Sequence, residues 1–320
     1  MTIVLAVDGG GSKTHLAICD ESGAVLGAAT AGPANWETVG LRGAADTIGD
    51  ALEKALVASG VRRDQIEAAA FGLAGVDWPS DVDRLTTALA SLRLTCPITL
   101  VNDSFIALRA GAQAPWGVVV IAGTGTVVAG RNRAGETFRT LGLGRLLGDD
   151  GSASDVAEQV VRAVARAYIG RAPATSLTEG LRALMGAGSV EEMLEEYSRG
   201  GEPELDAAPL ALEQAARGDA VAVGIIEWAA GELGGAAATV AGRLGMDGEP
   251  YELVLSGGLF RGGGELLETL ISRAVPTALL TRLEVPPVCG AVLMALELIG
   301  GRPAPDVQER CARGLTAAFR

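Results

Sequence analysis

The sequence predicts an α/β protein built from a duplicated domain, in which each copy is a mixed sheet with helices on its faces. Residues 3–18 form a pattern of strand, tight turn rich in Gly, Ser and Thr, and second strand, and residues 117–129 repeat this plan. In both halves, antiparallel strands are followed by alternating helices and strands. A third glycine turn, at 256–258, follows a later strand. Because glycine turns expose backbone amides to anions, the repeated hairpins suggest two halves that hold a polyphosphate between them.

The periodicity of apolar residues predicts the elements of each half. The first half is expected to contain strands at 2–8, 14–20 and 24–30, a helix at 38–59, a strand at 68–73, a helix at 81–92, a strand at 97–101 and a helix at 103–112. The second half is expected to contain strands at 117–123, 126–131 and 135–139, helices at 151–169, 175–186, 189–198 and 207–245, a strand at 251–256, a helix at 262–273, a strand at 278–282 and helices at 288–299 and 304–318.

Composition limits the classes of function. A chain of 320 residues ordinarily forms two domains, and 48% apolar residues suffice for their cores. A net charge of −13 argues against binding to nucleic acid or to an anionic membrane. We find no run of about 18 apolar residues and no basic region before the first strand, so neither a membrane span nor a signal peptide is expected. Four cysteines that are scattered along the chain fit free thiols in a reducing cytoplasm.

Histidine occurs once, as His15. This nearly excludes Ser-His-Asp, Cys-His and multi-histidine metal sites. His15 itself is interpreted as a satisfied side chain beside the sheet. Acid–base chemistry must therefore fall mainly to carboxylates.

Asp8 ends the first strand, immediately before three glycines. A carboxylate in this place suits a Mg²⁺ ion, held largely through water beside nucleotide phosphates. The alternative is a turn residue that satisfies the backbone. The hydroxyls of Ser12 and Thr14 are candidate donors to phosphate. Lys13 either neutralises phosphate charge or is solvated.

Asp103 follows Asn102 between a strand and a helix. Both residues favour helix N-caps, which is the structural alternative. The functional interpretation is a general base, because ligands of open α/β sheets bind at the carboxyl ends of the strands. A carboxylate there would accept the proton of the acceptor hydroxyl in phosphoryl transfer.

Two loops are candidates for sugar recognition. Residues 142–153 contain four glycines, and either cap the next helix or wrap around a small polyol while Asp149 binds its hydroxyls. Asn35 and Trp36 follow the third strand. Asn35 is either a turn residue or an amide that hydrogen-bonds a sugar. Trp36 is either a packing residue or an aromatic face on which the sugar stacks.

The motifs occur in order along the whole chain and are specific together. They resemble the sugar-kinase/actin/heat-shock ATPase superfamily, and within it the family that unites N-acetylglucosamine kinases with BadF/BadG/BcrA/BcrD-type ATPases. The matching segments are Val7–Thr14, Gly72–Gly75, Asn102–Asp103, Ala122–Thr126, Gly148–Ser152 and Leu255–Gly258.

The resemblance implies two ribonuclease-H-like (actin-like ATPase) domains hinged about an ATP cleft. The N-terminal domain would comprise residues 1–112, joined by the final helix at 302–320. The C-terminal domain would comprise residues 113–301, with a helical insertion. A homodimer is the expected assembly.

The resemblance also implies residue roles, with ATP and Mg²⁺ as cofactors. Asp103 matches the catalytic base, Asp8 is the expected metal residue, and Gly257 and Gly258 would lie against adenosine. The expected phosphate-binding residues are Gly9, Gly10, Gly11, Ser12, Lys13, Thr14, Gly123, Thr124, Gly125 and Thr126. The expected sugar-binding residues are Asn35, Asp103, Thr124, Gly142 and Asp149, to which the residue pattern adds Trp36.

The leading hypothesis is an ATP-dependent kinase that phosphorylates the 6-hydroxyl of an amino sugar, such as N-acetylglucosamine or glucosamine. One rival is an ATPase that drives electron transfer, like the family's activators of 2-hydroxyacyl-CoA dehydratases and benzoyl-CoA reductase. It would need two cluster cysteines per chain, and Cys19 and Cys289 fall in a strand and a helix, which does not suit ligation. A second rival is a sugar sensor without catalysis, which the acidity and the early first strand disfavour.

Two residues of the presumed sugar loop depart from the kinase pattern. Leu143 stands where many of the kinases carry Trp, and Arg145 stands where they carry other residues. If Arg145 points inward, it should disfavour protonated glucosamine and favour an acidic sugar such as N-acetylmuramic acid. The alternative is that Arg145 faces solvent or pairs with an acid such as Asp150.

Overall fold

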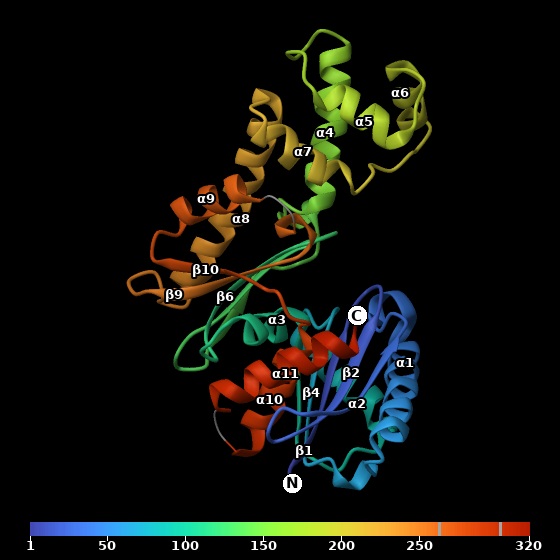
Figure 1. Cartoon of the computed structure of the whole chain (residues 1–320), viewed down its shortest axis with the longest axis vertical. Helices are drawn as coiled ribbons and strands as arrows, with labels where there is room; N and C mark the ends of the chain where they lie inside the picture. Colours follow the sequence, from blue (N-terminus) through green and yellow to red (C-terminus); the bar gives the residue numbers. More distant parts are fainter. Residues whose placement is uncertain (262–263, 301–302) are drawn as a thin grey trace. The chain divides into compact units, whose positions relative to one another are not determined.

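The chain folds into two compact units, each built around one sheet. The computed structural model describes residues 1–261, 264–300 and 303–320 (Figure 1). The first unit combines Met1–Gly117 with Leu283–Arg320, and the second unit comprises Val118–Arg282.

The first unit has a five-stranded sheet in the order β3-β2-β1-β4-β5. Strands β1, β2 and β3 pair antiparallel, whereas β4 and β5 run parallel to β1. Its main elements are β1 Ile3–Gly9, β2 Thr14–Asp20, β3 Val25–Ala31, α1 Trp36–Ser59, β4 Ala68–Leu73, α2 Pro79–Leu89, β5 Ile98–Asn102, α3 Asp103–Gly111, α10 Val288–Gly300 and α11 Pro305–Ala318.

The second unit repeats this topology. Its sheet order is β10-β9-β6-β7-β8, which is the order of the first sheet when the strands are renumbered from β6. Its main elements are β6 Gly117–Ala122, β7 Thr126–Arg131, β8 Thr137–Arg139, α4 Ala153–Tyr168, α5 Leu177–Met185, α6 Val190–Ser198, α7 Ala207–Ala216, α8 Ala220–Arg243, β9 Tyr251–Ser256, α9 Glu265–Ala274 and β10 Ala278–Arg282. The shared order confirms the predicted duplication of a mixed α/β domain.

One predicted helix is divided in the structure, and another contains an irregular residue. The expected helix at 207–245 is two helices, because Gly218 has a left-handed φ of 89° and Asp219 caps a new helix. Helix α1 contains a non-helical residue, Gly40, with a φ of 75°. The expected helix at 262–273 is described from Glu265, and residues 262 and 263 lie outside the described part of the chain.

The chain returns to the first unit earlier than residue 302. Leu283 already belongs to the first unit, because α10 packs on β1, β4 and α3. Figure 1 shows α10 and α11, in red, beside the blue strands of this sheet. The first unit is therefore completed by the C-terminal segment of the chain.

Strands β1 and β2 are buried on both faces of the sheet. Leu5 and Ile18 belong to the core beneath α1, whereas Ala6 and Cys19 belong to the core beneath α10 and α11. Both faces are thus covered by helices, which explains the nearly continuous apolar sequence of these strands. The ends of the strands remain for chemistry.

Helix α8 is the one helix in the described residues that is long and apolar enough to cross a membrane, judged by length and composition alone. It packs against α7 and α9 in the second unit and buries a row of apolar side chains that includes Ile226, Leu233 and Val240. Core packing accounts for its composition.

Candidate active site

The predicted base and the predicted metal residue lie at one edge of the first sheet. In the parallel pairs, Gly9 of β1 is opposite Leu73 of β4, and Leu73 is opposite Asn102 of β5. The carboxyl ends of three strands therefore coincide, with Asp8 on β1 and Asp103 directly after β5. This is the edge at which open α/β sheets bind ligands.

Asp8 and Asp103 are close enough for their charges to interact. Burial, and secondly the negative charge of Asp103, raise the pKa of the Asp8 carboxyl to about 7, while the nearby Lys13 opposes the shift. Two carboxylates that share one edge repel each other. A cation between them would remove that cost, so this pair of oxygen donors fits the predicted Mg²⁺.

Asp103 is the first residue of α3. Asn102 caps this helix, and its Oδ1 accepts a hydrogen bond of 3.1 Å from the Ser104 amide. Two glycines allow α3 to pack closely on its neighbours. A Cβ on Gly72 would lie 2.4 Å from the Ile106 side chain, and one on Gly290 would lie 1.9 Å from the Ile106 carbonyl oxygen. The position of Asp103 thus depends on tight packing of α3 between β4 and α10.

The first glycine turn, at residues 9–11, has free space next to the backbone of Gly11. The Gly10 amide donates a 3.0 Å hydrogen bond to the Lys13 carbonyl, which closes the turn. Neither Gly10 nor Gly11 has a left-handed φ, and a Cβ on Gly11 would meet no atom within 4 Å. A side chain would nevertheless occupy the space next to the backbone. The glycines therefore leave room for a ligand rather than supplying an unusual backbone conformation.

Gly9 has a different role. A Cβ on Gly9 would lie 2.6 Å from the Leu73 side chain, so this glycine allows β1 to approach β4. Ser12 and Lys13 are exposed on the turn. Within the first hairpin, the exposed predicted phosphate ligands are thus Gly11, Ser12 and Lys13.

Thr14 differs from the prediction that its hydroxyl faces phosphate. Its side chain is buried, and its hydroxyl donates a 2.8 Å hydrogen bond to the Gly32 carbonyl. The single hydroxyl proton is therefore already used to hold β2 against the segment after β3.

Thr126, at the corresponding place in the second unit, is also buried, but within the described residues its hydroxyl has no hydrogen-bond partner.

The second glycine turn is also open. The Gly123 amide donates to the Gly125 carbonyl at 3.0 Å, and a Cβ on either glycine would meet no atom within 4 Å. Thr124 is exposed at the tip of the turn. The Ala153 amide donates to the Gly123 carbonyl at 2.8 Å and ties the turn to the start of α4. Exposed amides and a hydroxyl here have the properties of an anion site.

Gly257 packs against the end of β6. It has a left-handed φ of 106°, and a Cβ on it would lie 2.3 Å from the Ala122 carbonyl oxygen. A larger residue is therefore excluded. Gly258, in contrast, has open space around it. Of the two residues predicted to adjoin adenosine, Gly257 is needed for packing, whereas Gly258 has space beside it for a ligand.

The predicted sugar loop is shaped by Asp149. This carboxylate is buried, and its Oδ2 accepts a 2.9 Å hydrogen bond from the Leu143 amide. Gly142 has a left-handed φ of 68°. The capping roles belong to Ser152 and Asp155, which form a capping box at the start of α4. Asp149 is therefore not the helix cap but the residue that closes the loop.

Arg145 is paired with acids. Its guanidinium lies 3.3 Å from both Asp150 and Asp155, and it also contacts Glu158. Its charge is therefore compensated within the second unit. This arrangement matches the alternative in which Arg145 pairs with Asp150 instead of reading the substrate.

Asn35 and Trp36 both have structural partners. The Oδ1 of Asn35 caps α1 by accepting from the Glu37 amide at 3.0 Å. The Trp36 indole donates to the Gly75 carbonyl at 2.6 Å, and the Arg84 guanidinium lies over its ring. The ring also packs on the core beneath α1. These contacts favour a packing role for Trp36.

His15 is buried beside the sheet and stacks on Phe319, with ring centroids 4.2 Å apart. Burial, and secondly the charge of Lys13, lower its pKa. This geometry fits the packing role expected for the single histidine.

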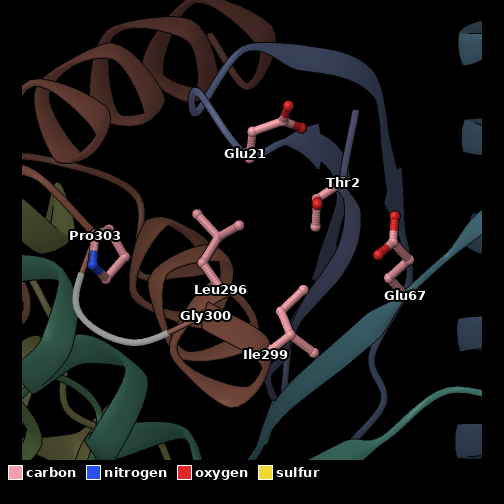
Figure 2. A pocket seen from close by; sticks show the side chains of 7 residues that line it. All are labelled: Thr2, Glu21, Glu67, Leu296, Ile299, Gly300 and Pro303. Carbon is pink, nitrogen blue, oxygen red and sulfur yellow. The ribbon is translucent and has the colours of Figure 1, made fainter.

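A surface pocket of about 230 Å³ lies at the opposite edge of the first sheet, near the amino ends of β1 and β4 (Figure 2). Figure 2 shows Glu21 and Glu67 on the sheet side and the apolar Leu296 and Ile299 on α10. It contains none of the residues predicted to bind phosphate or sugar.

The fold and the site define a class of protein. Two units with the same strand order, each with an open glycine turn, define a protein of the ribonuclease-H-like, actin-like ATPase fold class. A family model for the BadF/BadG/BcrA/BcrD ATPase family matches residues 5–295. The chain belongs to this family.

Similar proteins agree with this assignment. The N-acetyl-D-glucosamine kinase of Dictyostelium discoideum is 31% identical over 92% of this chain and 98% of its own length. The N-acetylmuramic acid/N-acetylglucosamine kinase of Clostridium acetobutylicum is 29% identical over 81% of this chain and 86% of its own length. A crystal structure of a candidate N-acetylglucosamine kinase from Chromobacterium violaceum has a TM-score of 0.70 and 21% identity, and covers 92% of this chain and 99% of that one.

Proposed function

We propose that this protein is an ATP-dependent kinase that phosphorylates the 6-hydroxyl of an amino sugar, N-acetylglucosamine or glucosamine. The observation that carries the proposal is the position of Asp103 at the carboxyl edge of the first sheet, where its charge interacts with that of Asp8. The relatives named as N-acetylglucosamine kinases support the substrate class.

The reaction requires one base and several groups that neutralise charge. Asp103 accepts the proton of the 6-hydroxyl while the sugar oxygen forms a bond to the γ-phosphorus of ATP. The bond from that phosphorus to its bridging oxygen breaks, and ADP leaves. Because phosphoryl transfer is catalysed mostly by positioning and electrostatics, one carboxylate suffices as the base.

The phosphates of ATP would be bound by the exposed groups of the two glycine turns. Gly11, Ser12 and Lys13 are available in the first turn, and Thr124 with its neighbouring amides in the second. Mg²⁺, held by Asp8 through water, would supply neutralisation of the phosphate charge. Gly258 would adjoin adenosine. For the sugar we propose Asn35, Thr124, Gly142 and Asp149 as ligands, and assign Trp36 to the scaffold.

The two rival functions lack supporting observations. A redox activator would need two thiols that are accessible for ligation, but Cys19, Cys289 and Cys311 are at most 1% exposed, and Cys96 alone is partly exposed. A DNA-bound sugar sensor would work against a net charge of −13. We therefore retain the kinase function. We also propose a cytoplasmic location and a homodimer, and sedimentation equilibrium tests the homodimer.

The experiment is a measurement of ADP release over a panel of hexoses and amino sugars. N-acetylglucosamine or glucosamine should raise the rate well above the basal hydrolysis of ATP, and the product should be the 6-phosphate. If no sugar raises the rate of ADP release, the protein is not a sugar kinase.

A further inference from the structure

Asp77 lies in the turn between β4 and α2, next to the predicted base, and the sequence patterns did not single it out. The Nδ2 of Asn102 donates a 3.2 Å hydrogen bond to Asp77 Oδ1. Asn102 is only 6% exposed, and the next residue along the chain is Asp103. Asp77 is therefore linked to the base through a single buried side chain.

Asn102 is held by a partner at each end of its amide. Its Oδ1 accepts from the Ser104 amide at 3.1 Å and from the Ser104 hydroxyl at 2.5 Å. Its Nδ2 donates to Asp77. A rotated amide would place oxygen against the Asp77 carboxylate and NH₂ against the Ser104 amide, and both contacts would be repulsive. Asp77 and Ser104 together thus select the orientation in which Asn102 caps α3.

Asp77 is itself fixed in place. The buried carboxylate of Asp81 accepts hydrogen bonds from the amides of Asp77, at 3.2 Å, and Trp78, at 2.8 Å. Earlier in the same turn, the Gly75 carbonyl accepts from the Trp36 indole at 2.6 Å. The turn is therefore anchored on both sides of Asp77, and the start of α2 is connected to the start of α3.

We propose that Asp77 is a positioning residue of the kinase reaction, which holds the base Asp103 in its catalytic position by fixing the Asn102 cap of α3. This inference rests on the proposed function. Asp103 is the first helical residue, so its backbone direction follows from the cap that precedes it. Loss of the Asp77 acceptor removes the partner of Asn102 Nδ2, so that only Ser104 holds the amide and the cap is less firmly fixed. A displacement of a base by about 1 Å lowers the rate of the chemical step by up to roughly 10²-fold.

The test compares three variants with the wild type in sugar-dependent ADP release. Asp77→Ala removes the acceptor and should lower kcat by about 10- to 100-fold, with little change in the KM for ATP. Asp77→Asn retains a carbonyl oxygen for Asn102, so it should stay within about threefold of the wild-type kcat. Asp83→Ala is the matched control, because it removes an exposed carboxylate on α2, the helix that follows Asp77, and should leave kcat unchanged.

The outcomes separate this inference from the proposed function. An inactive wild type overturns the kinase proposal and, with it, the role of Asp77. An active wild type with a wild-type kcat in Asp77→Ala overturns only the positioning role. Equal losses in Asp77→Ala and Asp77→Asn also overturn it, because the charge rather than the hydrogen bond would then matter. If Asp77→Ala does not fold, Ser104→Ala gives the second test, since removing one partner of Asn102 Oδ1 should lower kcat and leave the KM for ATP unchanged.

Discussion

At the residue scale, ion pairs within the protein determine which charged side chains are available to interact with a ligand. Arg145 lies in the loop proposed to bind the sugar, but Asp150, Asp155 and Glu158 already compensate its charge. Asp155 is only 6% exposed in its side chain, so its partner matters for the fold. Because these carboxylates offset the positive charge of Arg145, its field should contribute little to discrimination between sugars.

Arg145→Ala should therefore leave substrate preference unchanged and reduce stability. The ratios of kcat/KM for glucosamine, N-acetylglucosamine and N-acetylmuramic acid should stay within about twofold of wild type. Unfolding should cost about 1 kcal/mol less, because the half-exposed ion pairs are screened by solvent. Arg162→Ala is the control, since Arg162 also pairs with Glu158 but lies outside the loop. A tenfold change in any ratio would mean that Arg145 reads the substrate.

At the scale of the elements, Asp219 joins two helices of the second unit. Its Oδ1 accepts from the amides of Val221 and Ala222 at the start of α8. Its Oδ2 accepts from Thr175 and Ser176, which precede α5. Burial raises the pKa of Asp219, but these hydrogen bonds outweigh burial and lower it to about 2. The ionised carboxylate is thus the form that the fold stabilises.

Asp219→Asn should remove a pH-dependent part of the stability. A carboxylate whose pKa is lower in the folded than in the unfolded state stabilises above its unfolded pKa, and this contribution is lost as the pH falls from about 5 to about 2. At pH 7 the variant should be less stable by about 1–2 kcal/mol, and the difference should shrink towards pH 3. Urea unfolding at several pH values measures it.

Asp206→Asn is the matched control, because Asp206 stands at the start of α7 without a side-chain capping bond. Its stability relative to wild type should stay constant over the same pH range. A constant difference for Asp219→Asn as well would contradict the role of the carboxylate.

At the scale of the whole molecule, the first unit is assembled from both ends of the chain. Helix α11 packs on α10 and β3 and buries Cys311 and Leu315. Gln308 donates to the carbonyls of Ala110 and Ala112 at the C-terminal end of α3. The C-terminal helix therefore supports the same sheet whose carboxyl edge carries Asp8 and Asp103.

Deletion of residues 304–320 should loosen the first unit selectively. The loss of two buried side chains alone is worth on the order of 3–5 kcal/mol. Hydrogen-exchange mass spectrometry should show faster exchange in β2 and β3, whereas β9 of the second unit keeps its protection. Unchanged protection of β2 in the truncated protein would contradict this account.

The sequence was sufficient for most elements and for the mixed α/β character of each half, but not for every helix boundary or for contacts that join distant segments. Apolar strand segments on either side of glycine turns predicted both hairpins, because those signals are local. The boundary between α7 and α8 was missed, since apolar residues continue on both sides of Gly218. The hydroxyl bond of Thr14 to Gly32 and the bond of Asn102 to Asp77 bridge 18 and 25 residues. Such pairs depend on the packed fold and leave no periodic signal.

The central claim is that Asp103 is the base of an amino-sugar kinase, and kcat for Asp103→Asn tests it most directly. Asparagine keeps the shape of the side chain but does not accept the proton at neutral pH. With N-acetylglucosamine or glucosamine, whichever the wild type prefers, kcat should fall by roughly 10²-fold or more while ATP binding, measured by calorimetry, changes little. Turnover within a few fold of wild type in a pure sample of Asp103→Asn would contradict the account.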